Sequence, residues 1–288
     1  MGTPELWDLV VRPVNAVQAA EIMLGISPSA ARLLASALHA TSPEADALLF
    51  AVPRMMRSLV IATTIAPERC HGEVRGPIQW GETMSARAAN AGDPMVFVCA
   101  SPGRAYDAPE NRVLVAALES VRAAAAAVEV GRLKHRDTAL FHHIRANGSQ
   151  ARRFLEHRSL NAIPRVKPQP RDLKRARSGT RRRNYGPALL VLDRVGEGFS
   201  GDDLELVADE ATATEHDVVV EAVRHLRAAG HPIPGFRVRG GALVAGPLSY
   251  RHHRTRHPEL PGGLAVDGMP VEAARPDEVA GALRAVGW

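Results

Sequence analysis

Residues 104–125 read RAYDAPENRVLVAALESVRAAA, and this stretch predicts a long, alanine-rich helix. Asp107 stands two residues before Pro109, and an acidic N-cap with a proline in the first turn is a typical helix start. Apolar residues then recur at helical spacing, which places on one face Val113, Leu114, Ala117, Leu118 and Val121. We therefore predict a helix over residues 109–130.

The composition of the whole chain favours helix over sheet. Only 4% of the residues are aromatic, while alanine and arginine are abundant. Alanine, leucine and arginine have high helix propensity, whereas strands prefer aromatic and β-branched residues. We expect a mainly α fold with a small α+β part at the C-terminal end.

Several further segments carry local signals. Residues 15–64 predict a series of helices, two of which begin at Ser-Pro pairs, and Pro53 is expected to break or kink the last one. Residues 95–99 form an apolar run that predicts a strand. Two amphipathic helices are expected on either side of Asn147 and Gly148.

We divide the chain into three contiguous regions. Residues 1–66 form a helical N-terminal region, residues 67–196 a helical scaffold with a basic stretch, and residues 197–288 a small α+β region. Within the last region, residues 215–231 predict an amphipathic helix. Short apolar runs between glycine-rich turns follow Pro232 and predict a few strands.

Several classes of protein are excluded by what the sequence lacks. Cys70 and Cys99 are too few for a zinc site of their own or for a secreted disulfide scaffold. No run of about 18 apolar residues predicts a membrane span, and the N-terminus does not resemble a signal peptide. No phosphate-binding glycine motif is present. We expect a cytoplasmic protein.

Charge is distributed unevenly along the chain. Residues 132–183 contain 16 Lys and Arg against three acidic residues, although the whole chain has a net charge of only +5. The densest cationic run comprises Arg171, Lys174, Arg175, Arg177, Arg181, Arg182 and Arg183. Such clusters bind nucleic-acid phosphates, and the scarcity of nearby aromatic residues favours the backbone of a duplex over stacked single-stranded bases. A solvated surface loop is the alternative.

An acidic stretch balances this run. Residues 197–221 hold nine Asp and Glu and no Lys or Arg. This segment predicts a surface that docks a basic partner protein or covers the basic run when nucleic acid is absent.

Four motifs occur in a characteristic order: VRGPIQWGETMSARA at 74–88, YDAPENRVLVAALESV at 106–121, ARRFLEHRSLNAI at 151–163 and RRNYGPALLVLDRV at 182–195. Together they resemble the McrC-like family of restriction subunits over about residues 70–196. The matching residues are Gly76, Ile78, Trp80, Thr83, Pro109, Glu110, Asn111, Arg112, Leu114, Phe154, Leu155 and Tyr185.

The resemblance implies a DNA-linked role in defence against foreign DNA. In that family this region is a helical scaffold that precedes a PD-(D/E)xK nuclease domain and works with an AAA+ motor. In this chain, Glu110, Asn111 and Arg112 fall in the first turn of a helix, where an acidic side chain is favoured by the helix dipole. They serve either as a structural latch, with Asn111 or Arg112 bridging to the Trp80 segment, or as direct ligand contacts.

The nuclease that the resemblance implies is poorly supported by the residues. Its site needs an Asp on one strand and a Glu/Asp-x-Lys on the next, so that carboxylates hold Mg²⁺. Residues 235–288 contain no lysine, and the only candidates, Asp267 and Glu272, are five residues apart. We expect a degenerate remnant without catalytic residues, and Mg²⁺ as a cofactor only if a rearranged site exists.

A cluster of histidines raises the question of a metal. His252, His253 and His257 lie close together in sequence, with Glu259 nearby. Neutral imidazoles ligate zinc, but the arginines of the same stretch repel cations. We interpret this segment as a solvated basic loop without a metal.

The sequence thus predicts a nucleic-acid-binding, non-catalytic or degenerate McrC-like subunit that acts beside an AAA+ ATPase or a nuclease, with duplex DNA as the expected ligand. Two alternatives stay open. One is a Mg²⁺-dependent endonuclease with a rearranged site, and the other is a structural adaptor without nucleic-acid contact.

Overall fold

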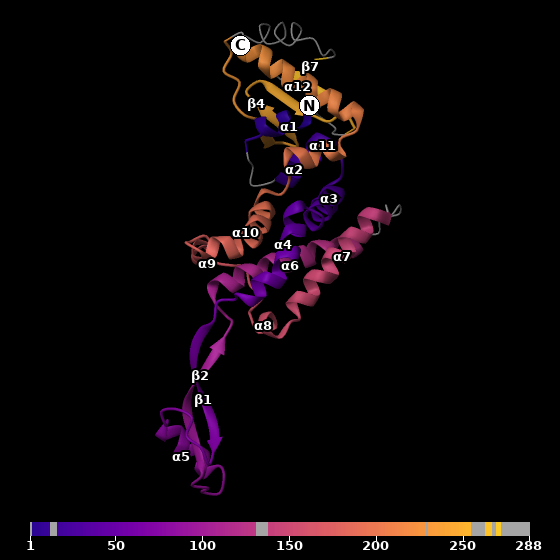
Figure 1. Cartoon of the computed structure of the whole chain (residues 1–288). Coiled ribbons are helices and arrows are strands. Elements are labelled where there is room, and N and C mark those ends of the chain that lie inside the picture. Colours follow the sequence, from indigo (N-terminus) through magenta and orange to yellow (C-terminus); the bar gives the residue numbers. More distant parts are fainter. Residues whose placement is uncertain are drawn as a thin grey trace. The chain divides into compact units, whose positions relative to one another are not determined.

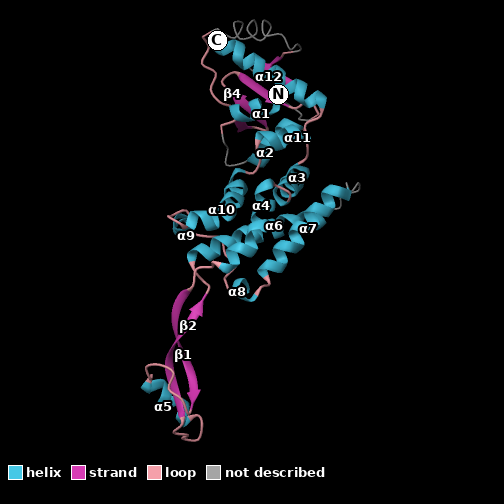
Figure 2. Cartoon of the chain, in the orientation of Figure 1, coloured by secondary structure: helices cyan, strands magenta, loops and turns pink. Residues whose placement is uncertain are grey.

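The computed structural model describes residues 2–11, 16–130, 138–228, 230–254, 263–266 and 269–271. These residues form mainly helices, with a small antiparallel sheet near the C-terminal end (Figures 1 and 2). The predicted fold class, mainly α with a small α+β C-terminal part, is confirmed. Asp267, Glu272, His257 and Glu259 lie outside the described residues.

The helices run in chain order as α1 (Gly2–Leu9), α2 (Ala16–Leu24), α3 (Pro28–Ala40), α4 (Pro43–Arg57), α5 (Trp80–Ala88), α6 (Pro109–Val130), α7 (Thr138–Leu155), α8 (Arg158–Asn161), α9 (Pro170–Ala176), α10 (Arg181–Glu197), α11 (Gly201–Val207) and α12 (Glu210–Ala228). The strands are β1 (Ala62–His71), β2 (Val96–Ala105), β3 (Arg237–Arg239), β4 (Ala242–Ala245), β5 (Leu248–Arg251), β6 (Gly263–Val266) and β7 (Met269–Pro270).

The chain divides into two compact units, each built from segments that are distant in sequence. Unit 1 comprises Met1–Ser42, Ala123–Ala146 and Asp193–Trp288, and unit 2 comprises Pro43–Arg122 and Asn147–Leu192. The regions predicted from sequence, 1–66, 67–196 and 197–288, are contiguous and therefore group the segments differently.

Unit 1 packs α1, α2 and α12 with a five-stranded sheet. The strands follow one another in the order β3-β4-β5-β6-β7, all antiparallel. The apolar face of α12 contributes Val219, Ala222 and Leu226 to a core that also contains Phe236 and Tyr250. The amphipathic helix and the strands predicted after Pro232 are therefore present.

A buried histidine links three helices inside unit 1. His216 lies on α12, and its Nδ1 is 2.8 Å from the hydroxyl of Thr3 on α1. Its Nε2 is 3.0 Å from the carbonyl oxygen of Met23 on α2. Because both ring nitrogens have partners, this polar ring is accommodated in an otherwise apolar core. Burial lowers the pKa of His216.

Unit 2 is organised around the N-terminal half of α6. Val113, Leu114, Leu118 and Val121 are all buried there, as the helical spacing predicts. They pack with buried residues of α4, α7 and α10, including Leu48, Leu155 and Ala188.

At Pro53, where the sequence predicts a break or kink, and at Asn147 and Gly148, where it predicts two separate helices, the helix is continuous. Helix α4 continues through Pro53 to Arg57, and α7 continues through Asn147 and Gly148. Buried side chains on both sides of each position hold the helices together, so packing outweighs local propensity. Asn147 also donates a hydrogen bond to Asp46, with Nδ2 and Oδ1 2.7 Å apart.

The expectation of helix up to residue 64 is wrong, because residues 62–71 form β1. This strand pairs with β2 in an antiparallel hairpin, with Cys70 opposite Phe97. The predicted strand at 95–99 is confirmed as the start of β2. The pairing of residues 62–71 with β2 therefore makes them a strand, although the helix α4 precedes them in sequence.

The segment that carries the Gly76, Ile78, Trp80 and Thr83 motif is built around β2. Ile78 forms a β-bridge to Cys99, and a Cβ at Gly76 would lie 2.4 Å from the carbonyl oxygen of Ala100. Thr83 is buried, and its hydroxyl accepts a hydrogen bond from the Val98 amide at 2.9 Å. Trp80 is 60% exposed.

Within the described part of the chain, helices that combine the length and the apolar character needed to cross a bilayer are absent.

His216 generates a prediction for the pH dependence of stability. Because burial lowers its folded-state pKa, the unfolded chain binds the proton first as the pH falls. The stabilisation is present above the ordinary histidine pKa of about 6.5 and is lost as the pH falls towards the folded-state value. Thermal unfolding followed between pH 7 and 5 should show a falling midpoint.

The matched variant is His216→Gln, in which this slope should be smaller. Part of the slope should remain, because burial also lowers the pKa of His252 in the same unit. Equal slopes in the two proteins would contradict the assignment.

Candidate nucleic-acid interface

Glu110 lies in the first turn of α6 and is almost completely buried, with 1% of its side chain exposed. Its carboxylate forms an ion pair with the guanidinium of Arg181 at the start of α10. Arg175 of α9 approaches the same oxygen, with 3.9 Å between Nε and Oε1. The burial of this charge is offset by two cations and by the positive end of the helix dipole.

Asn111 forms the centre of a buried hydrogen-bond network. Its Nδ2 donates to the carbonyl oxygens of Val60 and Tyr106, each at 2.8 Å. Its Oδ1 accepts hydrogen bonds from the amide of Val60 and from the hydroxyl of Tyr185. The network joins the segment after α4, the start of α6 and α10, and burial raises the pKa of the Tyr185 phenol.

Arg112 forms a two-pronged ion pair with Asp107, at 2.6 and 2.9 Å. This contact lowers the pKa of the Asp107 carboxyl. Asn111 and Arg112 are therefore bonded to Val60, Tyr106, Tyr185 and Asp107, and within the described residues neither side chain bridges to the Trp80 segment. These contacts lie within the protein, as a structural latch would need, and the alternative of direct ligand contact stays a prediction.

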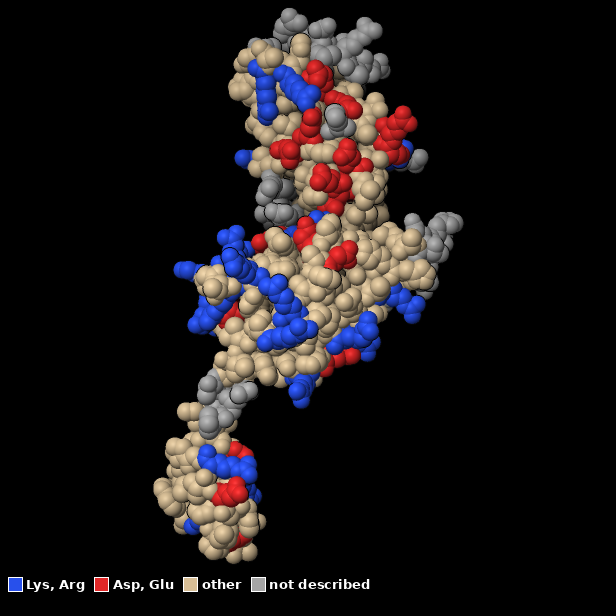
Figure 3. Space-filling view, viewed as in Figure 1, with Lys and Arg blue, Asp and Glu red and all other residues tan. Residues whose placement is uncertain are grey.

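The predicted basic run occupies α9 and the start of α10. The side chains of the run are exposed, except that Arg181 is partly buried against Glu110. Figure 3 shows Lys and Arg gathered over the part of unit 2 where α9 and α10 lie. The exposed members, which we call the basic surface, are Arg171, Lys174, Arg175, Arg177, Arg182 and Arg183.

A pocket of about 460 Å³ opens between α9 and the N-terminus of α6. Its lining residues are Pro109, Arg112, Arg171, Asp172, Lys174, Arg175 and Ser178. Four basic side chains thus face one acidic side chain. Asp172 turns one carboxylate oxygen towards the amide of Gln169, at 2.9 Å, so it also caps α9.

Part of the positive charge is already paired within unit 2. One carboxylate, Glu110, serves both Arg175 and Arg181, so their two positive charges are only partly compensated. Among the described residues, the side chains of Arg171, Lys174, Arg182 and Arg183 form no ion pair. The basic surface therefore keeps an excess of exposed cations.

The acidic stretch runs from the end of α10 through α11 into α12 of unit 1, and some of its carboxylates have partners. Asp203 pairs with Arg194, at 2.6 Å, and Asp209 pairs with Arg254, at 2.8 Å. The predicted solvated loop is wrong for His252, which is completely buried, whereas the side chain of His253 is 50% exposed.

The sequence identified the basic run and the latch residues but not the partners of the latch. Val60, Tyr106 and the pocket between α6 and α9 could be found only from the tertiary structure. Asp107 carried a signal as the predicted N-cap, although its observed role is to bind Arg112.

No protein-family model matches the chain, and a search of the curated proteins finds no match. The resemblance to McrC-like proteins therefore stays a prediction.

The ion pair of Glu110 generates a stability prediction. Arg181→Ala leaves a buried carboxylate with only the more distant Arg175. Breaking a buried pair costs about 3–5 kcal/mol, and because Arg181 is 42% exposed we expect a smaller loss of about 1–3 kcal/mol. Chemical denaturation measures the change in the free energy of unfolding.

The double variant Arg181→Ala/Glu110→Gln is the control. Removing the buried charge should recover much of the lost stability. The single variant Glu110→Gln is measured as well. If the free energy of unfolding lost in the double variant equals the sum of the losses in the two single variants, the residues are not coupled and the latch is misassigned.

Proposed function

We propose that this protein binds nucleic acid, with the phosphate backbone of a duplex as its ligand, through the basic surface of unit 2. The observation that carries the proposal is that Arg171, Lys174, Arg182 and Arg183 are exposed and form no ion pair with a described residue, together with a 460 Å³ pocket lined by four basic side chains. Each phosphate that such a surface neutralises releases counterions, which makes binding favourable and steeply dependent on salt.

The chemistry of the surface favours backbone contacts over the reading of bases. Guanidinium groups bind phosphate oxygens in a two-pronged arrangement, and Arg is the main residue of this surface. Stacking on single-stranded bases needs exposed aromatic rings. Tyr185, the one aromatic residue near the basic run in sequence, is buried and bonded to Asn111.

The resemblance to McrC-like subunits supports a wider role. In that proposal the protein acts in restriction of foreign DNA, beside an AAA+ ATPase or nuclease, as a non-catalytic or degenerate subunit. The latch formed by Glu110, Asn111 and Tyr185 would then be the scaffold that presents the basic surface. The two acidic candidates for a nuclease, Asp267 and Glu272, lie outside the described residues and add no support for cleavage.

Fluorescence anisotropy with a labelled duplex tests this proposal. Binding should be strong at 50 mM salt and should weaken steeply as salt is raised. Reversing two exposed charges, Arg182→Glu/Arg183→Glu, should weaken binding at least about 10-fold. The salt slope should fall by about one for each phosphate that the variant no longer neutralises.

The matched control is Arg237→Glu/Arg239→Glu, which makes the same change in net charge on β3 of unit 1, where both side chains are exposed. It should bind nearly as the unchanged protein. Equally weakened binding in both variants would indicate a non-specific effect of net charge, and no binding at 50 mM salt would favour an adaptor without nucleic-acid contact.

A further inference from the structure

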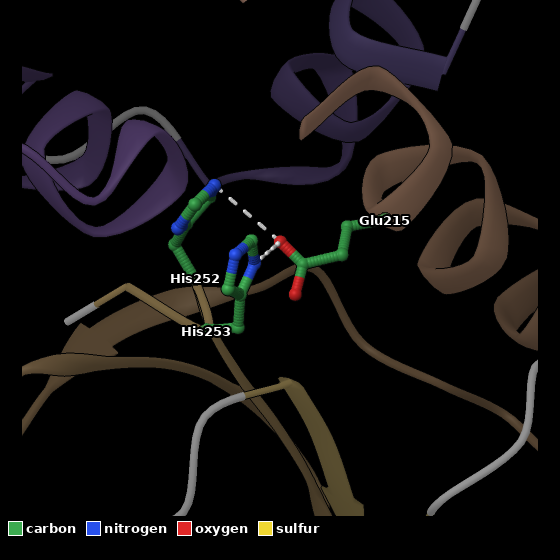
Figure 4. A group of neighbouring side chains, drawn as sticks. All are labelled: Glu215, His252 and His253. Atoms are coloured by element: carbon green, nitrogen blue, oxygen red, sulfur yellow. Dashed lines mark ion pairs between the residues drawn. The ribbon is translucent and has the colours of Figure 1, made fainter. Parts of the chain in front are cut away.

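Unit 1 contains a cluster of side chains that can ligate a metal ion. These residues are distant in sequence from the basic run of unit 2. Glu215 projects from α12, and His252 and His253 follow directly after β5 (Figure 4). One ligand atom of each residue lies within 4.8 Å of the other two. The helix and the end of the strand therefore bring a carboxylate and two imidazoles to one point.

Two of the three separations suit a single small cation, and the ligand atoms of the two imidazoles lie within 4.8 Å of each other. Glu215 Oε2 is 3.1 Å from Nδ1 of His253 and 3.5 Å from Nε2 of His252. Zinc bonds to nitrogen and oxygen are about 2.0–2.1 Å long, so two ligands of a tetrahedral ion are roughly 3.3 Å apart. The two measured distances lie on either side of this value.

The carboxylate oxygen at the centre is poorly satisfied. Glu215 Oε2 is buried and close to both rings, but among the described residues it accepts no hydrogen bond of standard geometry. The phenol of Tyr250 is also buried next to Glu215, and burial, the Glu215 charge and a side-chain contact with that carboxylate raise its pKa. A buried carboxylate oxygen without a well-aligned donor is costly, and a cation held between the carboxylate and the two imidazoles would satisfy it.

Two of the arginines that argued against a metal, Arg251 and Arg254, have other partners, and Arg256 lies outside the described residues. Arg251 donates from Nε and Nη2 to the carbonyl oxygen of Gly241, at 3.1 and 2.8 Å. Arg254 binds Asp209 at 2.8 Å. Arg254 is therefore paired with an acid other than Glu215, and Arg251 donates to a backbone carbonyl instead of to the Glu215 carboxylate.

A competing arrangement uses His252 as a hydrogen-bonding group. Its Nε2 is 3.0 Å from the hydroxyl of Thr212, which itself donates to Asp209, and its Nδ1 accepts from the amide of Arg254 at 3.1 Å. Metal binding by Nε2 would place the ring proton on Nδ1, so the contact with the Arg254 amide would have to open. The experiment must distinguish the two arrangements.

We propose that Glu215, His252 and His253 form a binding site for a divalent transition-metal ion of the zinc class. Two imidazoles and one carboxylate select such an ion over Mg²⁺ or Ca²⁺, which prefer oxygen ligands. Three protein ligands leave a fourth position for water. The ion would join α12 to the end of β5 and stabilise unit 1 by mass action.

Titration of the metal-free full-length protein with Zn²⁺, followed by calorimetry, tests the site, and Co²⁺ reports the ligands by its visible spectrum. We expect one ion per chain and a higher thermal midpoint in the presence of Zn²⁺. The Co²⁺ spectrum should lack the intense near-ultraviolet band of thiolate ligands, which separates this site from Cys70 and Cys99.

His253→Ala is the informative variant, because the half-exposed side chain can be removed without opening the core. It should weaken Zn²⁺ binding by more than about 10-fold and abolish the thermal shift, with an unchanged midpoint in the metal-free protein. Glu215→Gln should act in the same direction.

His225→Ala is the matched control, since it removes a histidine from the same helix and should bind Zn²⁺ as the unchanged protein does. Absence of binding in the unchanged protein, or equal binding in His253→Ala, would overturn the proposal and leave the hydrogen-bonded arrangement of His252 with Thr212. Nucleic-acid binding is not an outcome of this test, so the two proposals fail separately.

Discussion

The ion pair between the buried carboxylate of Glu110 and the guanidinium of Arg181 is the constraint on which unit 2 depends. A charge that is almost fully removed from water is tolerated only with a close counter-charge, so the start of α10 must meet the first turn of α6. The neighbouring Asn111 then joins the same two helices through Tyr185 and adds the segment after α4 through Val60. The packing of the helices and the buried polar contacts of Glu110 and Asn111 therefore favour the same arrangement of the helices in unit 2.

This constraint also organises the basic surface. Arg175 and Arg181 share Glu110, and Arg112 is held by Asp107, so the positions of these cations are set by the fold. Among the described residues, Arg171, Lys174, Arg182 and Arg183 are exposed and form no ion pair. The basic surface therefore combines cations whose positions are fixed by ion pairs with exposed cations that add the positive charge needed to attract phosphates.

Unit 1 uses the same principle with histidines. His216 satisfies its two ring nitrogens with Thr3 and Met23 and joins three helices through the core. His252, also buried, lies where α12 meets the end of β5 and shares its surroundings with Glu215. In each unit, a few buried polar side chains determine which elements meet, because an unpaired buried polar group costs more than a mismatched apolar contact.

The sequence by itself determined the helical character of the chain, the face of α6 that is buried and the location of the basic run, since these depend on spacing and composition along a short stretch. Only the tertiary structure decided that α4 and α7 continue through Pro53 and Gly148, and that residues 62–71 form a strand. The partners of Glu110 and Asn111, and the meeting of Glu215 with His252, also depend on contacts between distant segments. Such contacts arise from packing and long-range pairing, which local propensity does not encode.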